Sequence, residues 1–198
     1  MRRIERVYRE VLYQVIEKRQ NFLTQKNLSK ECTISIGNVY HALKPLESMN
    51  AIEKKPRGFK VINPKKILLY WASIRNLQKD IVYQTFSNKP VVEIEKMMPV
   101  CLFTSYSGYK FIFNSTPSDY SEVFLYANKE EVERRFPKTK NKPNIFVLKT
   151  DEHLMKFKQI PLAQLFVDLW NISTWYAQDF LKVLEEKIDG ILERRNNR

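Results

Sequence analysis

The chain has 198 residues, a formal net charge of +12 and a pI near 9.6. Hydrophobic residues make up 43% of it, and its length is enough for one large core or two small ones. No stretch reaches the roughly 20 apolar residues of a membrane span, and the charged N-terminus lacks an apolar signal core. We therefore expect a cytoplasmic protein whose distant cysteines, Cys32 and Cys101, are reduced and buried.

The positive charge is concentrated at the start of the chain. Residues 1–66 contain 15 of the 34 basic residues but only 6 of the 22 acidic ones. An excess of this kind on one region is the electrostatic footprint expected of a surface that contacts phosphate groups.

Two helices are predicted before residue 33. Apolar residues at i, i+3, i+4 and i+7 predict a first helix over residues 4–16. Its first turns carry four arginines, which could contact nucleic acid or form an ordinary solvated face: Arg2, Arg3, Arg6 and Arg9. Thr24 is a plausible N-cap for a second helix over residues 25–32.

A third helix is predicted from Ser35, and it has two distinct faces. The apolar face is Ile36, Val39, Tyr40, Leu43, Leu46 and Met49. The opposite face holds small or hydrogen-bonding residues, which suit a helix that enters a major groove: Gly37, Asn38, His41, Lys44 and Ser48. We expect the helix to continue through Pro45, because the apolar pattern stays in register, and to end at Asn50.

A basic hairpin follows the third helix. Residues 51–55 and 59–62 are predicted strands around the turn Pro56-Arg57-Gly58. Together these elements predict an N-terminal winged helix-turn-helix. Four residues of the helix face would read bases: Ser35, Asn38, His41 and Lys44. Thr33, in the turn before the helix, is a further predicted DNA-binding residue. Four hairpin residues would contact phosphates or the minor groove: Lys54, Lys55, Arg57 and Lys60.

The rest of the chain predicts an α+β fold. Asn63 and Pro64 begin a helix that extends to about residue 77, so we divide the chain into a DNA-binding domain, 1–75, and a regulatory α+β domain, 76–198. The second domain has strand candidates at 122–127 and 145–149, an uncertain segment at 81–86 and an aromatic core segment at 102–113. Helices are predicted at 91–98, 129–136, 162–171 and 174–193. We expect the last two helices to cover the sheet, with Asp168 in a structural ion pair or cap.

No catalytic, metal or cofactor site is predicted. The two histidines, His41 and His153, lack partners at metal-ligand spacing, and the glycines are isolated. The alternative is a nucleic-acid enzyme, a metal-dependent nuclease or nucleotidyl transferase, which would need clustered carboxylates. The candidates are Glu93, Glu95, Asp151 and Glu152. A third possibility is a protein-binding module that uses the winged helix for docking.

With these motifs placed, the chain resembles the AbiEi-type antitoxins, winged-helix regulators of type IV toxin–antitoxin systems. The resemblance lies in the segment from Arg57 to Ala72, the strand–helix pair from Ser121 to Phe136, and a helix with Gln164, Asp168 and Leu169. It implies a repressor that binds double-stranded DNA at its own operon. It also implies a C-terminal domain that helps to antagonise a cognate nucleotidyltransferase-like toxin without a tight complex.

Overall fold

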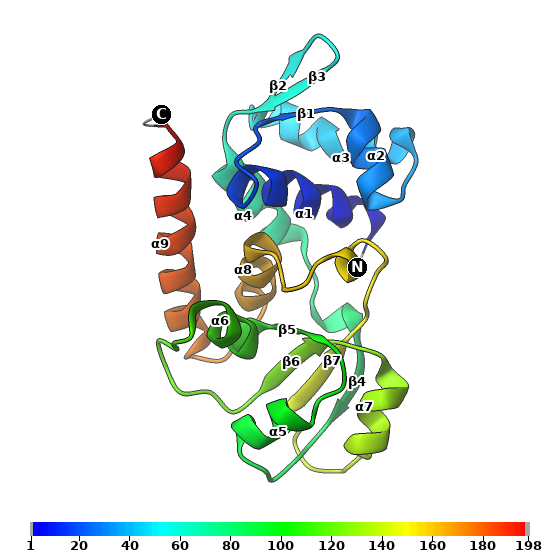
Figure 1. Cartoon of the computed structure of the whole chain (residues 1–198), viewed down its shortest axis with the longest axis vertical. Helices are drawn as coiled ribbons and strands as arrows, with labels where there is room; N and C mark the ends of the chain where they lie inside the picture. The colour runs from blue at the N-terminus through cyan, green and yellow to red at the C-terminus, as the bar shows by residue number, and fades with distance from the viewer. Residues whose placement is uncertain (1, 197–198) are drawn as a thin grey trace.

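The computed structural model describes residues 2–196 and is mixed α+β, with two separate sheets (Figure 1). The first half holds helices α1 (Arg3–Ile16), α2 (Gln25–Cys32), α3 (Ile36–Ser48) and α4 (Pro64–Ile74). Its sheet contains β1 (Phe22–Leu23), β2 (Ile52–Lys55) and β3 (Gly58–Val61), antiparallel in the order β1-β3-β2. None of the described helices is long and apolar enough to cross a membrane.

Local capping signals set the helix starts as predicted. The side chains of Thr24, Ser35 and Asn63 each accept a backbone N–H three residues ahead, at the starts of α2, α3 and α4. Helix α3 continues through Pro45, and Asn50 just beyond it has a left-handed φ of 55°. These predictions are confirmed.

The predicted apolar face of α3 is partly wrong. Val39, Leu43 and Leu46 are buried together with Ala42, which the predicted stripe omitted, but Ile36 and Tyr40 are 53% and 41% exposed. Helix α3 packs against α1 and α2, which cover the side of α3 that carries Val39, Ala42 and Leu46. Tyr40 lies at the edge of that side, where its ring is 4.9 Å from Lys44 Nζ.

The β2–β3 hairpin is closed by a two-residue turn, Pro56-Arg57. Arg57 has a φ of 68°, as at the third position of a type II turn, where glycine or asparagine is usual. Gly58 is needed for a different reason: a Cβ there would lie 2.5 Å from the carbonyl oxygen of Leu23 in the neighbouring strand β1. The hairpin therefore has a crowded base and an arginine at its tip.

The second half contains a four-stranded sheet in the order β4-β7-β6-β5. Its strands are β4 (Ile81–Thr85), β5 (Leu102–Thr104), β6 (Val123–Tyr126) and β7 (Ile145–Leu148); β6 and β7 are parallel and the other pairs antiparallel. The helices are α5 (Val91–Met97), α6 (Ser105–Phe113), α7 (Lys129–Arg135), α8 (Leu162–Trp170) and α9 (Ala177–Asn196), with short 3-10 turns at Gln78–Asp80 and Leu154–Lys156. The aromatic segment 102–113 thus divides into a strand and a helix at Ser105, whose φ is 55°.

Helix α8 lies between the two halves of the molecule. Residues 161–169 are all buried, because α8 packs against α1 and α4 on one side and against α6 and β5 on the other (Figure 1). Helix α9 packs on α8 and α6. The expectation that both helices simply cover the sheet is therefore wrong: α8 is apolar around most of its circumference and needs neighbours on every side. The division at residue 75 stays a prediction.

Candidate nucleic-acid interface

The side chains predicted to read bases lie on the outer side of α3, and Thr33, also predicted to bind DNA, lies in the turn before it. Thr33, Ser35, His41 and Lys44 are exposed and Asn38 is half-buried. Ser35 Oγ accepts the N–H of Asn38 at 3.2 Å, so one of its hydrogen-bonding roles is already used in capping the helix. The structure thus leaves one polar face of α3 open to solvent.

An open groove lies at the start of this face. Three of the residues that line it, Thr33, Ser35 and Asn38, belong to the predicted DNA-binding set. Basic residues of α1 and α2, Arg3, Arg6 and Lys30, and the acidic Glu152 from the second half complete its lining together with Ser29 and Ile34. The predicted base-reading surface therefore continues into a basic groove.

The hairpin lies at the other end of α3, and its basic residues divide between two faces. Lys54 faces α3: its Nζ is 2.8 Å from Glu47, and it lines a shallow hollow with Tyr40 and Lys44. Lys55 pairs with Glu53, and Glu53 lies opposite Lys60 on the other face of the hairpin. The four predicted hairpin contacts therefore do not share one surface with α3.

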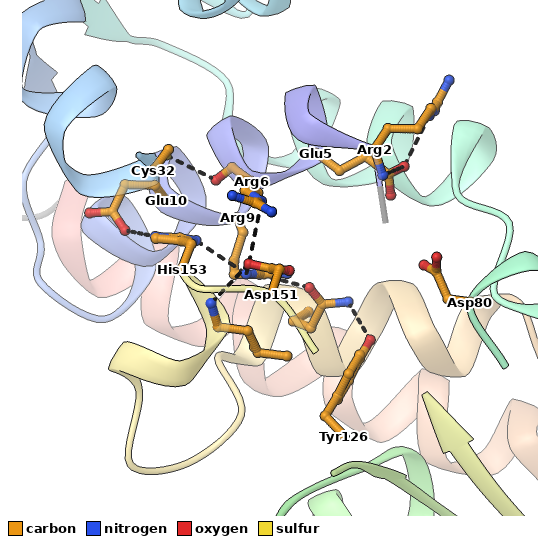
Figure 2. A network of polar contacts seen from close by, with 12 residues as sticks. Arg2, Glu5, Arg6, Arg9, Glu10, Cys32, Asp80, Tyr126, Asp151 and His153 are labelled. Carbon is orange, nitrogen blue, oxygen red and sulfur yellow. Dashed lines mark hydrogen bonds and ion pairs between the residues drawn. The ribbon is translucent and has the colours of Figure 1, made fainter. Parts of the chain in front are cut away.

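The N-terminal arginines separate into exposed and buried groups. Arg2 and Arg3 are exposed, and Arg6 is half-buried. Arg9 is completely buried, which excludes it from a nucleic-acid surface. Its guanidinium donates to both carboxylate oxygens of Asp151, at 3.0 and 2.9 Å, as part of the polar network in Figure 2.

Two side chains of α8, Gln164 and Asp168, extend this network across the core. Arg9 Nε donates to Gln164 Oε1 at 2.8 Å, and Gln164 Nε2 donates to Asp168 Oδ1 at 2.9 Å. Asp168 in turn pairs with Arg75 at 3.3 Å, as the structural assignment predicted, and accepts the hydroxyls of Thr104 and Tyr126. Gln164 and Asp168 are four residues apart, so they lie on the same face of α8. Together they link Arg9 of α1 to Arg75, the residue that follows α4.

His153 closes the same network beside Arg9. Its Nε2 is 2.8 Å from Glu10 Oε2, and its Nδ1 is 3.1 Å from Arg9 Nη1. Burial lowers the pKa of His153, an effect that the charge of Arg9 adds to and the hydrogen bond with Glu10 opposes. Burial also disfavours ionisation of Asp151, but the contacts with Arg9 outweigh it and lower the pKa of that carboxyl to about 2.

The carboxylates considered for metal-dependent catalysis form two separate pairs, one on α5 and one in the loop after β7. Glu95 is bonded to Lys110 and Tyr120, and Asp151 is bonded to Arg9. Glu93 and Glu152 are exposed on different elements. In residues 2–196, no three His, Cys, Asp or Glu side chains are grouped in a way that could hold a metal ion.

Sequence reasoning missed Lys30 and Glu152 as parts of this surface. Each comes from a different element, and Glu152 lies more than a hundred positions from the rest of the groove. The only local signal was the excess of positive charge before residue 66.

Residues 6–93 match the family model of the Firmicute plasmid replication protein, RepL. The matched segment extends from the first turns of α1 into α5, and so includes α2, α3 and the hairpin. Searches of curated proteins and of solved structures give no match. The resemblance to AbiEi-type antitoxins has no counterpart in these comparisons, so the antitoxin role stays a prediction.

Proposed function

We propose that the protein is a winged helix-turn-helix regulator that binds double-stranded DNA in a sequence-specific manner. In this proposal α3 enters the major groove and the β2–β3 hairpin lies beside it as the wing. The observation that carries the proposal is the continuity of the polar face of α3 with the basic groove at its start, which Arg3, Arg6 and Lys30 line. The match of residues 6–93 to a DNA-binding plasmid replication family supports it independently.

The test compares a selected duplex with a random one. A duplex selected from a random library would be bound with each variant by fluorescence anisotropy. Asn38→Ala should cost on the order of 1–3 kcal/mol on the selected site and little on random DNA, because the amide is proposed to contact a base edge. Gln178→Ala removes an exposed amide on α9 and serves as the control. Equal losses on both duplexes would show that α3 does not read bases.

The biological output we propose is transcriptional repression, in keeping with the resemblance to the antitoxin regulators and their nucleotidyltransferase-like toxins. A reporter with the selected site in its promoter should lose expression when the protein is present. If the site instead maintained an otherwise defective plasmid, without effect on the promoter, a replication role like that of the matched family would replace repression.

We also propose that the protein has no catalytic activity. The engagement of Asp151 and Glu95 with basic side chains supports this, because such carboxylates are poorly placed to bind a metal ion. Labelled DNA and RNA incubated with Mg²⁺ or Mn²⁺ should stay intact. Cleavage or nucleotide transfer that is abolished by Glu93→Gln or Glu152→Gln would make the enzyme the better assignment.

A further inference from the structure

The groove at the start of α3 gathers basic side chains from two helices. Arg3 and Lys30 are exposed, and neither forms an ion pair with another residue in the part of the chain that the structure describes. Arg6 has a side chain that is 17% exposed, and its Nε lies 3.5 Å from Asp151 Oδ1 without a hydrogen bond. Three cations on one concave surface create a positive potential that favours an anion.

The second half of the chain supplies one wall of the groove. Asp151 lies beside Arg6 and binds Arg9, which fixes this loop to α1. Lys156 Nζ donates to the carbonyl oxygen of Glu31 at 2.6 Å, which fixes the same loop to the end of α2. Between these two anchors, the exposed Glu152 reaches the groove, and among the described residues it is the one acidic side chain in the lining.

We infer that this groove binds the phosphodiester backbone of duplex DNA, and that Glu152 lowers the affinity of the site. The inference rests on the proposed function. A backbone is favoured over a free phosphate because the groove is open and continues onto Ser35 and Asn38, two of the proposed base-reading residues. Arg3 and Lys30 contribute charge, and Asp151 orients Arg6 as a positioning residue. The carboxylate of Glu152 repels the phosphates, so the second half of the chain sets the strength of DNA binding.

The test is the salt dependence of binding to the selected duplex, measured between roughly 50 and 200 mM salt. Lys30→Gln and Arg3→Gln each remove one exposed cation, so each should reduce the magnitude of the negative slope of log K against log salt by about 0.9. Binding near 0.1 M salt should be roughly tenfold weaker. Glu152→Gln should tighten binding. Lys182→Gln and Glu186→Gln change the same charges on exposed sites of α9 and should leave affinity and slope unchanged.

The outcomes separate the two proposals. If the wild-type protein binds the duplex and the groove variants behave like the α9 controls, the groove does not contact the backbone, whereas the proposed function stands. If Glu152→Gln fails to tighten binding, the role of Glu152 is wrong. If the wild-type protein binds no duplex even at low salt, the proposed function itself fails. A slope whose magnitude falls for Lys30→Gln and Arg3→Gln, but not for the α9 controls, supports the inference.

Discussion

Arg9 and Asp151 are 142 positions apart in the sequence, yet they form a two-point ion pair inside the molecule, with N–O distances of 3.0 and 2.9 Å. The Arg9 side chain is fully buried, and that of Asp151 is 7% exposed. The pair joins α1 to the loop after β7. The two halves of the chain are therefore held together by charge as well as by the apolar surface of α8.

Asp151→Asn should lower the free energy of unfolding by about 3–5 kcal/mol, because it removes the carboxylate that forms a two-point ion pair with the buried Arg9 guanidinium. Urea unfolding followed by circular dichroism would measure the change. The neighbouring variant Glu152→Gln removes an exposed carboxylate and should alter stability by no more than about 0.5 kcal/mol. Similar small effects for both variants would mean that the pair contributes nothing to stability.

His153 should be neutral at pH 7, with its proton on Nε2. Its Nε2 faces the Glu10 carboxylate and its Nδ1 faces an Arg9 N–H, which can only donate. Since the folded pKa lies below the ordinary 6.5, the unfolded chain takes up the proton first, and stability should fall as the pH drops below about 6.5. NMR of the imidazole nitrogens in a His41→Gln background isolates this ring; a folded-state titration above pH 6.5 would contradict the assignment.

Arg57→Gly should stabilise the fold while weakening DNA binding. Glycine removes the cost of a left-handed arginine, about 1–2 kcal/mol. It also loses more chain entropy on folding, which costs about 0.5–1 kcal/mol, so the free energy of unfolding should rise by about 0.5–1 kcal/mol. The magnitude of the slope of log K against log salt should fall by about 0.9, as for one lost phosphate contact. Arg57→Ala is the matched control, since it loses the charge but keeps the strained backbone. It should weaken binding equally and give no gain in thermal stability.

A chain that ends at residue 160 should not unfold cooperatively. It lacks α8, whose residues 162–169 are buried against α1, α4, α6 and β5. It also lacks Gln164 and Asp168, the partners of Arg9 and Arg75. A chain that ends at Glu193 keeps both helices and controls for truncation as such. A sharp calorimetric transition in the shorter chain would show that the remaining elements form a core without α8.

The sequence predicted the elements of the first half well because their signals are local. Thr24, Ser35 and Asn63 cap helices through atoms three residues away, and a Pro-led turn defines the hairpin. The edge of the buried face of α3 was not predictable, because the packing of α1 and α2 decides whether Tyr40 is covered. In the segment 102–113, alternating aromatic and polar residues hid the start of α6.

The composition of the site was predictable only in part, for a similar reason. The polar residues of α3 follow one another at helical spacing and could be assigned together. The role of Arg9 depends on Asp151, and that of the groove depends on Glu152, both supplied by a distant loop. Charge alone made all four N-terminal arginines candidates for the same exposed surface, whereas the structure buries Arg9. Long-range pairing of this kind leaves no periodic pattern in the sequence.

The close approach of Gly58 to β1 limits how this protein can diverge. Any larger residue there collides with the Leu23 backbone, so a substitution of Gly58 should disturb the packing of the hairpin on β1, whichever side chains the tip carries. The tip, residues 54–57, is exposed and free of such a collision, and its restriction is the left-handed φ of Arg57, which favours glycine or asparagine. The side chains at the tip of the hairpin can therefore vary, while the packing of its base on β1 holds the direction in which the hairpin points.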